Sequence, residues 1–274
     1  MSGITTFVFR KLPKSFNRAI RPRGACEINV EKAEMQHENF RRIVTSRMKR
    51  DNYVVLSPAE SFPDSVFIED SCVSLCDGIA VATTPSAPTR QGESGLMRPF
   101  LESLAMTGQL DCVYNMHEKC DGGDVLCIGK HVFVGASQRT NRAAHARWRQ
   151  ICHRHDLSCT SIPIENSLHL KSVVTWLNED IGLIAEKSVD GYRAAEMITS
   201  ALPRHLQSVH FVDFGANMLR INKTVIHQPG LFLRNLYRRH PQLEFVECDM
   251  SELNKAGGAL TCGVVALRTT EKED

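Results

Sequence analysis

Apolar and polar positions follow one another along the chain in an order that changes from strand-like to helix-like. Residues 5–9 alternate in the manner of a β-strand. A helical pattern then runs from about residue 29 to residue 48, with glutamates and basic residues on its wet side. The apolar candidates on this helix are Ala33, Met35, Phe40, Ile43 and Val44.

After this helix, one order of elements recurs. The first copy begins with short apolar strands at 66–68 and 72–75, turns at 76–78, and continues with a strand at 79–82. It ends in a helical pattern over about 91–106. We expect each later copy to use the same order: strand, turn, strand, helix.

Three further copies follow, the last of them weaker. Their ranges are 124–128, 131–134 and 138–153; then 168–177, 180–185 and 189–201; then 217–221, 224–227 and 231–239. A final strand at 262–267 closes the sequence without a helix of its own.

The copies recur at a nearly constant period. If equivalent strands begin at Asp70, Asp124, His169, Asn217 and Cys262, the spacings are about 54, 45, 48 and 45 residues. Such a period indicates a radial repeat or a solenoid. Because the first and last strands lack partners, we expect the N-terminal strand and helix to complete a fifth module with the C-terminal strand. The predicted fold is α/β: one domain over residues 1–274, a closed ring of five ββαβ-like units with strands inside and helices outside.

Composition excludes several classes of protein. Lys and Arg number 33 against 31 Asp and Glu, so the net charge of +2 gives no signal for nucleic acid. With 42% hydrophobic and 23% charged residues, the chain has the composition of a folded globular protein. Its apolar runs fall far short of the roughly 20 residues that a membrane span needs. We expect that the protein binds neither nucleic acid nor a membrane. We expect a small-molecule substrate, and a protein that is a monomer or a homodimer.

Ten irregularly spaced cysteines without a hydrophobic leader favour reduced thiols and a cytosolic location. Six basic residues precede the first acid, Glu27, which is also typical of a mitochondrial transit peptide. Pro13, Pro22 and the strand-like alternation at 5–9 argue against the amphipathic helix that such a peptide forms.

In a closed ring, the residues at equivalent strand starts face one central channel, although they are far apart in sequence. Cys262 follows the small-residue segment 257–261, where backbone N–H groups could lower a thiol pKa; the alternative is a buried apolar cysteine. His169 lies between Leu168 and Leu170, so its side chain is expected on the face opposite theirs. There it is either a general acid and base or a structural hydrogen-bonding group.

Carboxylates are dense around the same strand starts, which suggests a cationic ligand. Two adjacent acids that enter a strand point to opposite faces, so one of Glu69 and Asp70 would enter the pocket. Arg90 and Arg139 each stand between hairpin and helix in their copies, so two guanidinium groups could bind one carboxylate; the alternative is ordinary surface arginine. The acids are Asp64, Glu69, Asp70, Asp121 and Asp124.

Familiar cofactor motifs are missing from the sequence. The glycines at 122–123 lack the spacing of a dinucleotide site, and no phosphate-binding loop motif occurs. Cys152, His153, His155 and Cys159 match no standard zinc spacing. We therefore expect no cofactor and no metal site.

Several short motifs occur along the chain in this order: Arg10-x-Leu12-Pro13-x-Ser15, Ala33-Glu34-x-Gln36-His37, Phe67-Ile68-Glu69-Asp70, Ala87-Pro88-x-Arg90, Asp121-Gly122-Gly123-Asp124-Val125-Leu126, Arg139-Thr140-Asn141, Leu168-His169-Leu170-Lys171-Ser172, and Ser251-Glu252-Leu253 followed by Leu260-Thr261-Cys262. Taken together, these motifs resemble the dimethylarginine dimethylaminohydrolase family, a member of the guanidine-modifying, five-module α/β-propeller (pentein) superfamily. The resemblance covers nearly the whole chain.

The resemblance implies a role for each matching position. Cys262 is implied as the nucleophile, His169 as general acid and base, and Asp121 as the acid that orients His169. The implied substrate contacts are Asp64 for the α-amino group, Glu69 and Asp70 for the guanidinium, Arg90 and Arg139 for the α-carboxylate, and the main-chain carbonyls of Ile20, in a mobile lid loop, and Ala256.

The implied activity is hydrolysis of dimethyl- and monomethylarginine to citrulline through a covalent thiouronium on the cysteine, without a cofactor. Removal of methylarginines would relieve inhibition of nitric oxide synthase. Gly257 departs from the pattern, because many animal relatives have an acid there, and Gly263 stands where they have a second cysteine. Two alternatives stay open: an arginine deiminase that acts on unmethylated arginine, and a methylarginine-binding protein without catalysis.

Overall fold

Five three-stranded sheets make up the strand content of the described chain. The structure is a computed structural model and describes residues 4–48, 52–76, 78–177, 181–203, 208–212, 216–231 and 233–270. In every sheet, two antiparallel strands are followed by a third that returns parallel to the middle strand after a helix. This order is the predicted ββαβ module.

The modules follow one another along the chain. Their elements are β3 (Cys72–Ser74), β4 (Ile79–Thr84), α2 (Glu93–Met106) and β5 (Cys112–Lys119); β6 (Val125–Ile128), β7 (His131–Ala136), α3 (Arg142–Arg154) and β8 (Ser158–Pro163); β9 (Val174–Trp176), β10 (Ile181–Ala185), α4 (Val189–Ala201) and β11 (Ser208–Val212); and β12 (Leu219–Ile221), β13 (Thr224–His227), α5 (Arg234–Arg239) and β14 (Glu244–Glu247).

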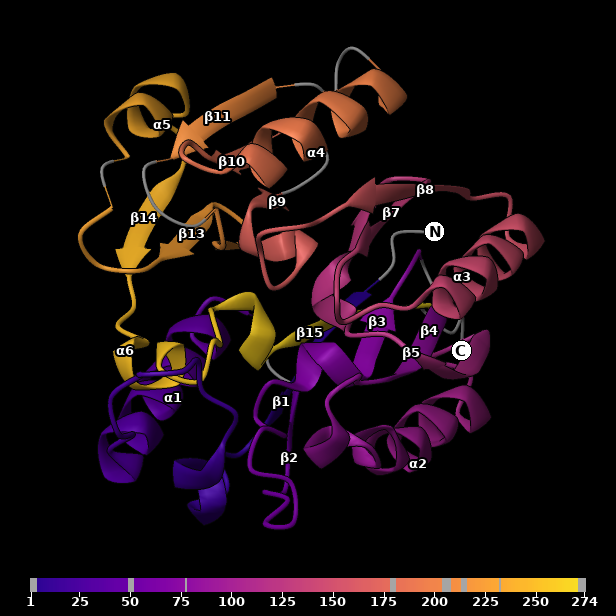
Figure 1. The fold of residues 1–274 in the computed structure, drawn as a ribbon, viewed down its shortest axis with the longest axis horizontal. Coiled ribbons are helices and arrows are strands. Elements are labelled where there is room, and N and C mark those ends of the chain that lie inside the picture. The colour runs from indigo at the N-terminus through magenta and orange to yellow at the C-terminus, as the bar shows by residue number, and fades with distance from the viewer. Residues whose placement is uncertain are drawn as a thin grey trace.

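The two ends of the chain build the fifth module together. β15 (Val265–Thr269) pairs antiparallel with β1 (Ile4–Arg10), and β2 (Tyr53–Leu56) returns parallel to β1 after α1 (Val30–Thr45). A short helix, α6 (Ser251–Asn254), packs against α1. Figure 1 shows the modules around a common centre, with the long helices towards the rim and the indigo β1 beside the yellow β15. The predicted five-module α/β propeller is therefore confirmed.

Packing between helix and sheet explains the sequence pattern of α1. Ala33, His37, Phe40 and Val44 recur at helical spacing and are buried against the sheet. The Asn29 side chain caps the helix by accepting a hydrogen bond from the Lys32 N–H at 2.9 Å. Met35 was expected on this apolar face, but it is 70% exposed. That prediction is wrong because position 35 falls between the turns that contact the core.

The segments that precede the first strands also differ from the prediction. Residues 66–68 do not form a strand: Val66 and Phe67 lead through a turn into the 3-10 helix Ile68–Ser71. Asp70, Asp124 and Cys262 also lie in short 3-10 helices just before their strands, and His169 directly precedes one. The five markers do occupy equivalent places, but in turns at the strand starts rather than in the strands. Asp180, the predicted start of another strand, lies outside the described residues.

Hydrogen bonds join these turns around the centre of the ring. Asp70 accepts from the Gly123 N–H, and Asp124 accepts from the Leu170 N–H. The Asn217 amide donates to the Lys171 carbonyl and to the Thr261 hydroxyl. The Thr261 hydroxyl donates to Glu69, which completes a circuit of hydrogen bonds around the ring. Each link joins two different modules, so the centre is tied together by side chains as well as by packing.

None of the helices in the described ranges combines the length and the apolarity needed to cross a bilayer.

Candidate active site

The turns at the centre of the ring bring together polar side chains from all five modules. Close approach of two of these turns depends on the glycines of the Asp121–Asp124 motif. A Cβ atom on Gly123 would lie 2.6 Å from Nδ1 of His169, and one on Gly122 would collide with the Glu69 carbonyl oxygen. The two glycines are therefore needed for packing, which explains their presence without a dinucleotide.

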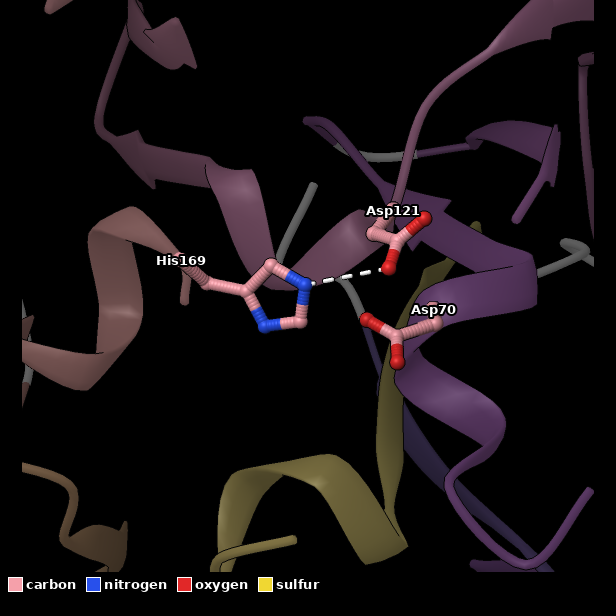
Figure 2. Close-up of side chains that lie close together, drawn as sticks. All are labelled: Asp70, Asp121 and His169. Carbon is pink, nitrogen blue, oxygen red and sulfur yellow. Dashed lines mark hydrogen bonds and ion pairs between the residues drawn. The ribbon is translucent and has the colours of Figure 1, made fainter. Parts of the chain in front are cut away.

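His169 and Asp121 form a buried pair (Figure 2). Nε2 of His169 donates to Oδ2 of Asp121 at 3.1 Å, and Oδ1 of Asp121 accepts from the Ser86 N–H at 2.7 Å. Burial acts to lower the pKa of the imidazole, but the carboxylates of Asp70, Asp121 and Asp124 outweigh it and raise the pKa of His169 to about 9. The ring is thus cationic at neutral pH.

The neighbouring leucines do not lie where the strand alternation placed them. Leu168 is 40% exposed, whereas Leu170 is fully buried, so the two side chains do not share a face opposite His169. His169 directly precedes a 3-10 helix instead of entering a strand, so the alternation of side chains between two faces does not apply here.

Cys262 lies in the 3-10 helix Thr261–Gly263 and is partly buried. Burial raises the pKa of its thiol, and the negative charges of Glu69 and Asp70 raise it further. Lys171 and a backbone hydrogen bond with Ala259 act in the opposite direction but do not prevail. The backbone contact of the small-residue loop thus lowers the pKa as expected, but burial of the thiol and the neighbouring acids outweigh it, so the net change is a rise.

Asp70 is ionised and held by two partners. Its Oδ2 accepts from Nη1 of Arg90 at 2.6 Å, and its Oδ1 accepts from the Gly123 N–H at 3.1 Å. Burial acts to raise the pKa of Asp70, but Arg90 and the charge on His169 lower it to about 2. Glu69 lies beside it in the same 3-10 helix and not in a strand as predicted.

Glu69 is held by residues of two other modules. Its Oε1 accepts from Nζ of Lys171 at 2.6 Å, and its Oε2 accepts from Oγ1 of Thr261 at 3.1 Å. Burial acts to lower the pKa of Lys171, but Glu69 outweighs it and raises that pKa. The carboxylate is therefore fixed next to the turn that carries Cys262.

Asp64 is buried and faces the loop that contains Ile20. Both of its carboxylate oxygens accept from the Ile20 N–H, at 3.0 and 3.3 Å. Burial raises the pKa of Asp64, although Arg90 and this backbone hydrogen bond oppose the rise.

The two arginines occupy the predicted junctions but differ in their surroundings. Arg90, in the 3-10 helix before α2, is buried and binds Glu93 through Nε at 2.9 Å and Nη2 at 2.8 Å. Its Nη1 binds Asp70, and its Nη2 also donates to the Phe67 carbonyl at 3.0 Å. Arg139 is more exposed, and its Nη1 lies 3.4 Å from Oδ2 of Asp121. A bound carboxylate therefore reaches Arg139 more readily than Arg90.

A narrow cleft of about 30 Å³ collects nearly all of the predicted site residues. Glu69 lines instead a larger adjoining cavity of about 400 Å³, which the cleft meets at His169, Gly257 and Cys262. The predicted site residues that line the cleft are Ile20, Asp64, Asp70, Arg90, Asp121, Arg139, His169, Ala256 and Cys262.

Sequence reasoning did not assign a role to several residues that hold this site. Glu93 neutralises Arg90, and the Arg-x-x-Glu spacing at the start of a helix is the signal that could have identified this pair. Lys171 and Thr261 fix Glu69, but their partners lie in other modules, so a single sequence gives no local sign of them.

Within the described ranges, one group of acidic and histidine side chains has the spacing for a metal ion: Asp70, Asp121 and His169, whose ligand atoms lie within 4.8 Å of one another. Both carboxylates already pair with arginine, and the imidazole is cationic at neutral pH. These charges oppose a metal cation at this place.

The sequence model of the arginine deiminase family matches residues 25–231, which is more than half of the chain. The chain belongs to the arginine deiminase family. A Streptomyces coelicolor protein named N(G),N(G)-dimethylarginine dimethylaminohydrolase is 31% identical over 221 residues, 78% of this chain and 78% of that protein. The resemblance seen in the motifs is thus confirmed, and the chain is an enzyme of the guanidine-modifying superfamily.

Solved structures of the superfamily share the fold. Dimethylarginine dimethylaminohydrolase from Pseudomonas aeruginosa, a cysteine-to-serine variant in complex with citrulline, matches with a TM-score of 0.80 at 22% identity, over 97% of this chain and 100% of that one. The N-terminal domain of ArgZ, a cyanobacterial arginine dihydrolase in complex with its substrate, matches with a TM-score of 0.77 at 18% identity, over 96% and 98%.

Proposed function

We propose that this enzyme hydrolyses Nω,Nω-dimethyl-L-arginine, and Nω-monomethyl-L-arginine, to L-citrulline and the corresponding amine. The observation that carries the proposal is the meeting of Cys262 and His169 with groups for both ends of such a substrate in one cleft. Relatives that carry the name of this activity support the same choice.

The substrate is bound through charge at both ends. Asp70, which is ionised, and Glu69, which is paired with Lys171, lie beside Cys262 and hold the guanidinium. Arg139 binds the α-carboxylate with support from Arg90, and the α-ammonium binds Asp64. The Ile20 N–H uses only part of the acceptor capacity of Asp64, so the carboxylate oxygens can also accept from the ammonium. The carbonyls of Ile20 and Ala256 then accept from the bound ammonium.

The cation also prepares the nucleophile. A thiol whose pKa is raised by burial and by two carboxylates stays protonated in the empty site. A guanidinium placed between those carboxylates and the sulfur cancels their charge and favours the thiolate. Bound substrate thus promotes loss of the thiol proton to solvent.

Catalysis then uses one thiolate and one imidazolium. The Sγ of Cys262 attacks the guanidinium carbon, the imidazolium of His169 gives its proton to the substituted nitrogen, and dimethylamine leaves. The neutral imidazole next takes a proton from water, the hydroxide attacks the thiouronium carbon, and the carbon–sulfur bond breaks to give citrulline. Asp121 holds Nε2 of His169, so Nδ1 is the nitrogen that exchanges protons.

The second candidate is deimination of unmethylated arginine, which the matching family model favours. Both reactions use the same nucleophile and give citrulline, so they differ in the leaving group. A third candidate, a binding protein without catalysis, predicts affinity for methylarginine and no product. Under the first proposal the enzyme works without a cofactor in the cytosol, as a monomer or homodimer, and removes inhibitors of nitric oxide synthesis.

The test is citrulline release from dimethylarginine, monomethylarginine and arginine by the purified protein. Cys262→Ala is the blank, and Cys26→Ala, at an exposed cysteine, is the matched control. We expect release from the methylated substrates, a loss of about 10⁴-fold or more in Cys262→Ala, and normal rates in Cys26→Ala. Release mainly from arginine supports deimination instead, and binding without citrulline supports the non-catalytic protein.

A further inference from the structure

The larger cavity beside Cys262 is far bigger than two methyl groups require. It has a volume of about 400 Å³, against about 30 Å³ for the cleft that carries Asp64 and Arg139. The two spaces meet at Cys262, His169 and Gly257. A substrate whose amino-acid end lies in the narrow cleft and whose guanidinium carbon lies at the sulfur therefore directs its Nω-substituents into the larger cavity.

The walls of this cavity suit an uncharged group. Its ionic residues are already paired, Glu69 with Lys171 at 2.6 Å, and Asn217 is bonded to Thr261. Pro229, Leu231 and Ala259 add apolar atoms to the lining, and Ser172 and Gln228 add uncharged polar ones. A charged substituent would meet no unpaired counter-charge here, whereas an alkyl group gains from burial against these side chains.

Size then defines the class of substituent. An engineered protein cavity of about 150 Å³ accepts benzene, so a space of about 400 Å³ holds a substituent of several carbon atoms. We propose that the enzyme cleaves Nω-alkylarginines with an uncharged substituent bulkier than two methyl groups, such as butyl. The inference rests on the proposed function, and it specifies the substituent that the site prefers.

The chemical step is unchanged by the larger group. Cys262 attacks the guanidinium carbon, the bond from that carbon to the butyl-bearing nitrogen breaks, and this nitrogen takes the His169 proton. Water then completes the reaction, so Nω-butyl-L-arginine and water give citrulline and butylamine.

The experiment compares kcat/KM for citrulline release from Nω-butyl-L-arginine and from dimethylarginine. In the wild type, we expect the butyl substrate to be used at least as well, because burial of each added methylene is worth roughly 0.8 kcal/mol. Leu231→Trp and Ser172→Leu each place bulk into the cavity from different walls. Each should lower the butyl-to-dimethyl ratio of kcat/KM by about tenfold or more.

Val189→Trp, at an exposed position on α4, is the matched control and should leave the ratio unchanged. Thermal unfolding of each variant establishes that it is folded, and the second cavity variant serves if Leu231→Trp does not fold. Dimethylarginine turnover with negligible butyl turnover, or an unchanged ratio in both cavity variants, overturns the inference and leaves the proposed function intact. Absence of citrulline from every substrate overturns both.

Discussion

The protonation state of His169 depends on a balance between burial and charge at a single residue. Burial favours the neutral ring, and the carboxylates around it favour the cation strongly enough to raise the pKa to about 9. A general acid with this pKa keeps its proton at neutral pH, which the departure of an amine requires.

We predict that the His169 ring titrates near pH 9, well above the ordinary value of about 6.5. NMR of the ring resonances, assigned with His169→Gln, measures it. Asp121→Asn removes a negative charge from the ring, so its titration should move to lower pH. Because the folded pKa is raised, the stabilisation from this group is complete below about pH 6.5 and is lost as pH rises through about 9. An ordinary midpoint in the wild type would refute the assigned charge state.

Gly257 is explained by its backbone. It has a φ of +75°, a region that L-residues seldom adopt, and the nearest atom to an added Cβ is Cδ2 of Leu168 at an ordinary 3.6 Å. The acid present at this position in many animal relatives would therefore be strained here by conformation and not by lack of space.

We predict that Gly257→Ala lowers the free energy of unfolding by about 1–2 kcal/mol. The matched control is Gly95→Ala inside α2, where the added Cβ meets no atom within 4 Å and the conformation is helical. That change should stabilise the protein by about 0.5–1 kcal/mol. Chemical denaturation of both variants measures the difference, and equal effects would contradict the backbone explanation.

At the level of single residues, the sequence predicted Cys262, His169 and the surrounding acids as site residues because each occurs in a contiguous motif, and Cys262, His169 and Asp70 line one cleft. It did not predict that Arg90 would be buried against Glu93 and Asp70, or that the Cys262 thiol would have a raised pKa. Glu93 is a sequence neighbour of Arg90, but Asp70 and the acids that act on the thiol come from other segments, so a local pattern contains no sign of those contacts.

In one module, a helix cap lies directly beside site residues. The Asn141 side chain accepts from the Ala144 N–H at 2.8 Å and starts α3 directly after Arg139 and Thr140. Thr140 in turn donates to Asp124 at 2.6 Å, so the cap is connected to the central turns. The cap of α4 by Ser188 is a similar contact without a site residue beside it.

We predict that Asn141→Ala lowers the free energy of unfolding by about 1 kcal/mol, or a few degrees in Tm, and raises the KM for dimethylarginine. Loss of the cap loosens the segment that holds Arg139. Ser188→Ala should cost similar stability and leave KM unchanged. Equal KM values in the two variants would show that the cap of α3 does not affect substrate binding.

Helices and hairpins were predictable because their apolar residues recur at the period of each element. For example, the range predicted for α4, 189–201, is the range that the structure shows. The segments before the first strands were misjudged. Val66, Phe67 and Ile68 read as a strand by composition, but they form a turn and the start of a 3-10 helix, where the Phe67 carbonyl accepts from the buried Arg90. Tertiary contacts override local propensity there.

On the scale of the whole molecule, Asn217 connects three modules. Its Nδ2 donates to Oγ1 of Thr261 at 2.9 Å and to the Lys171 carbonyl at 3.3 Å, and its Oδ1 accepts from the Thr261 N–H at 3.0 Å. Thr261 is adjacent to Cys262, so this amide holds the turn that carries Cys262 in the ring.

We predict that Asn217→Ala lowers the free energy of unfolding by about 1–3 kcal/mol, because buried partners lose their hydrogen bonds. It should also reduce kcat, since the turn that carries Cys262 loses its anchor. Gln109→Ala, which removes an exposed amide, is the control and should change stability by less than about 0.5 kcal/mol. A stable Asn217→Ala protein with normal kcat would show that the circuit of hydrogen bonds does not support the site.

The ring itself followed from the period of the repeat and from two unpaired terminal strands, which the pairing of β1 with β15 confirms. The hydrogen-bonded circuit at its centre was not predictable, because its members are separated by 44 to 192 residues. That residues 1–274 act as one domain stays a prediction.

The most direct test of the central claim, that Cys262 attacks the substrate, is mass spectrometry of the intact protein after acid quenching during turnover of dimethylarginine. We predict an adduct with the mass of the substrate less dimethylamine, located on the peptide that contains Cys262 and missing from Cys262→Ala. Citrulline formation at full rate in Cys262→Ala, or an adduct on another cysteine, would contradict the account.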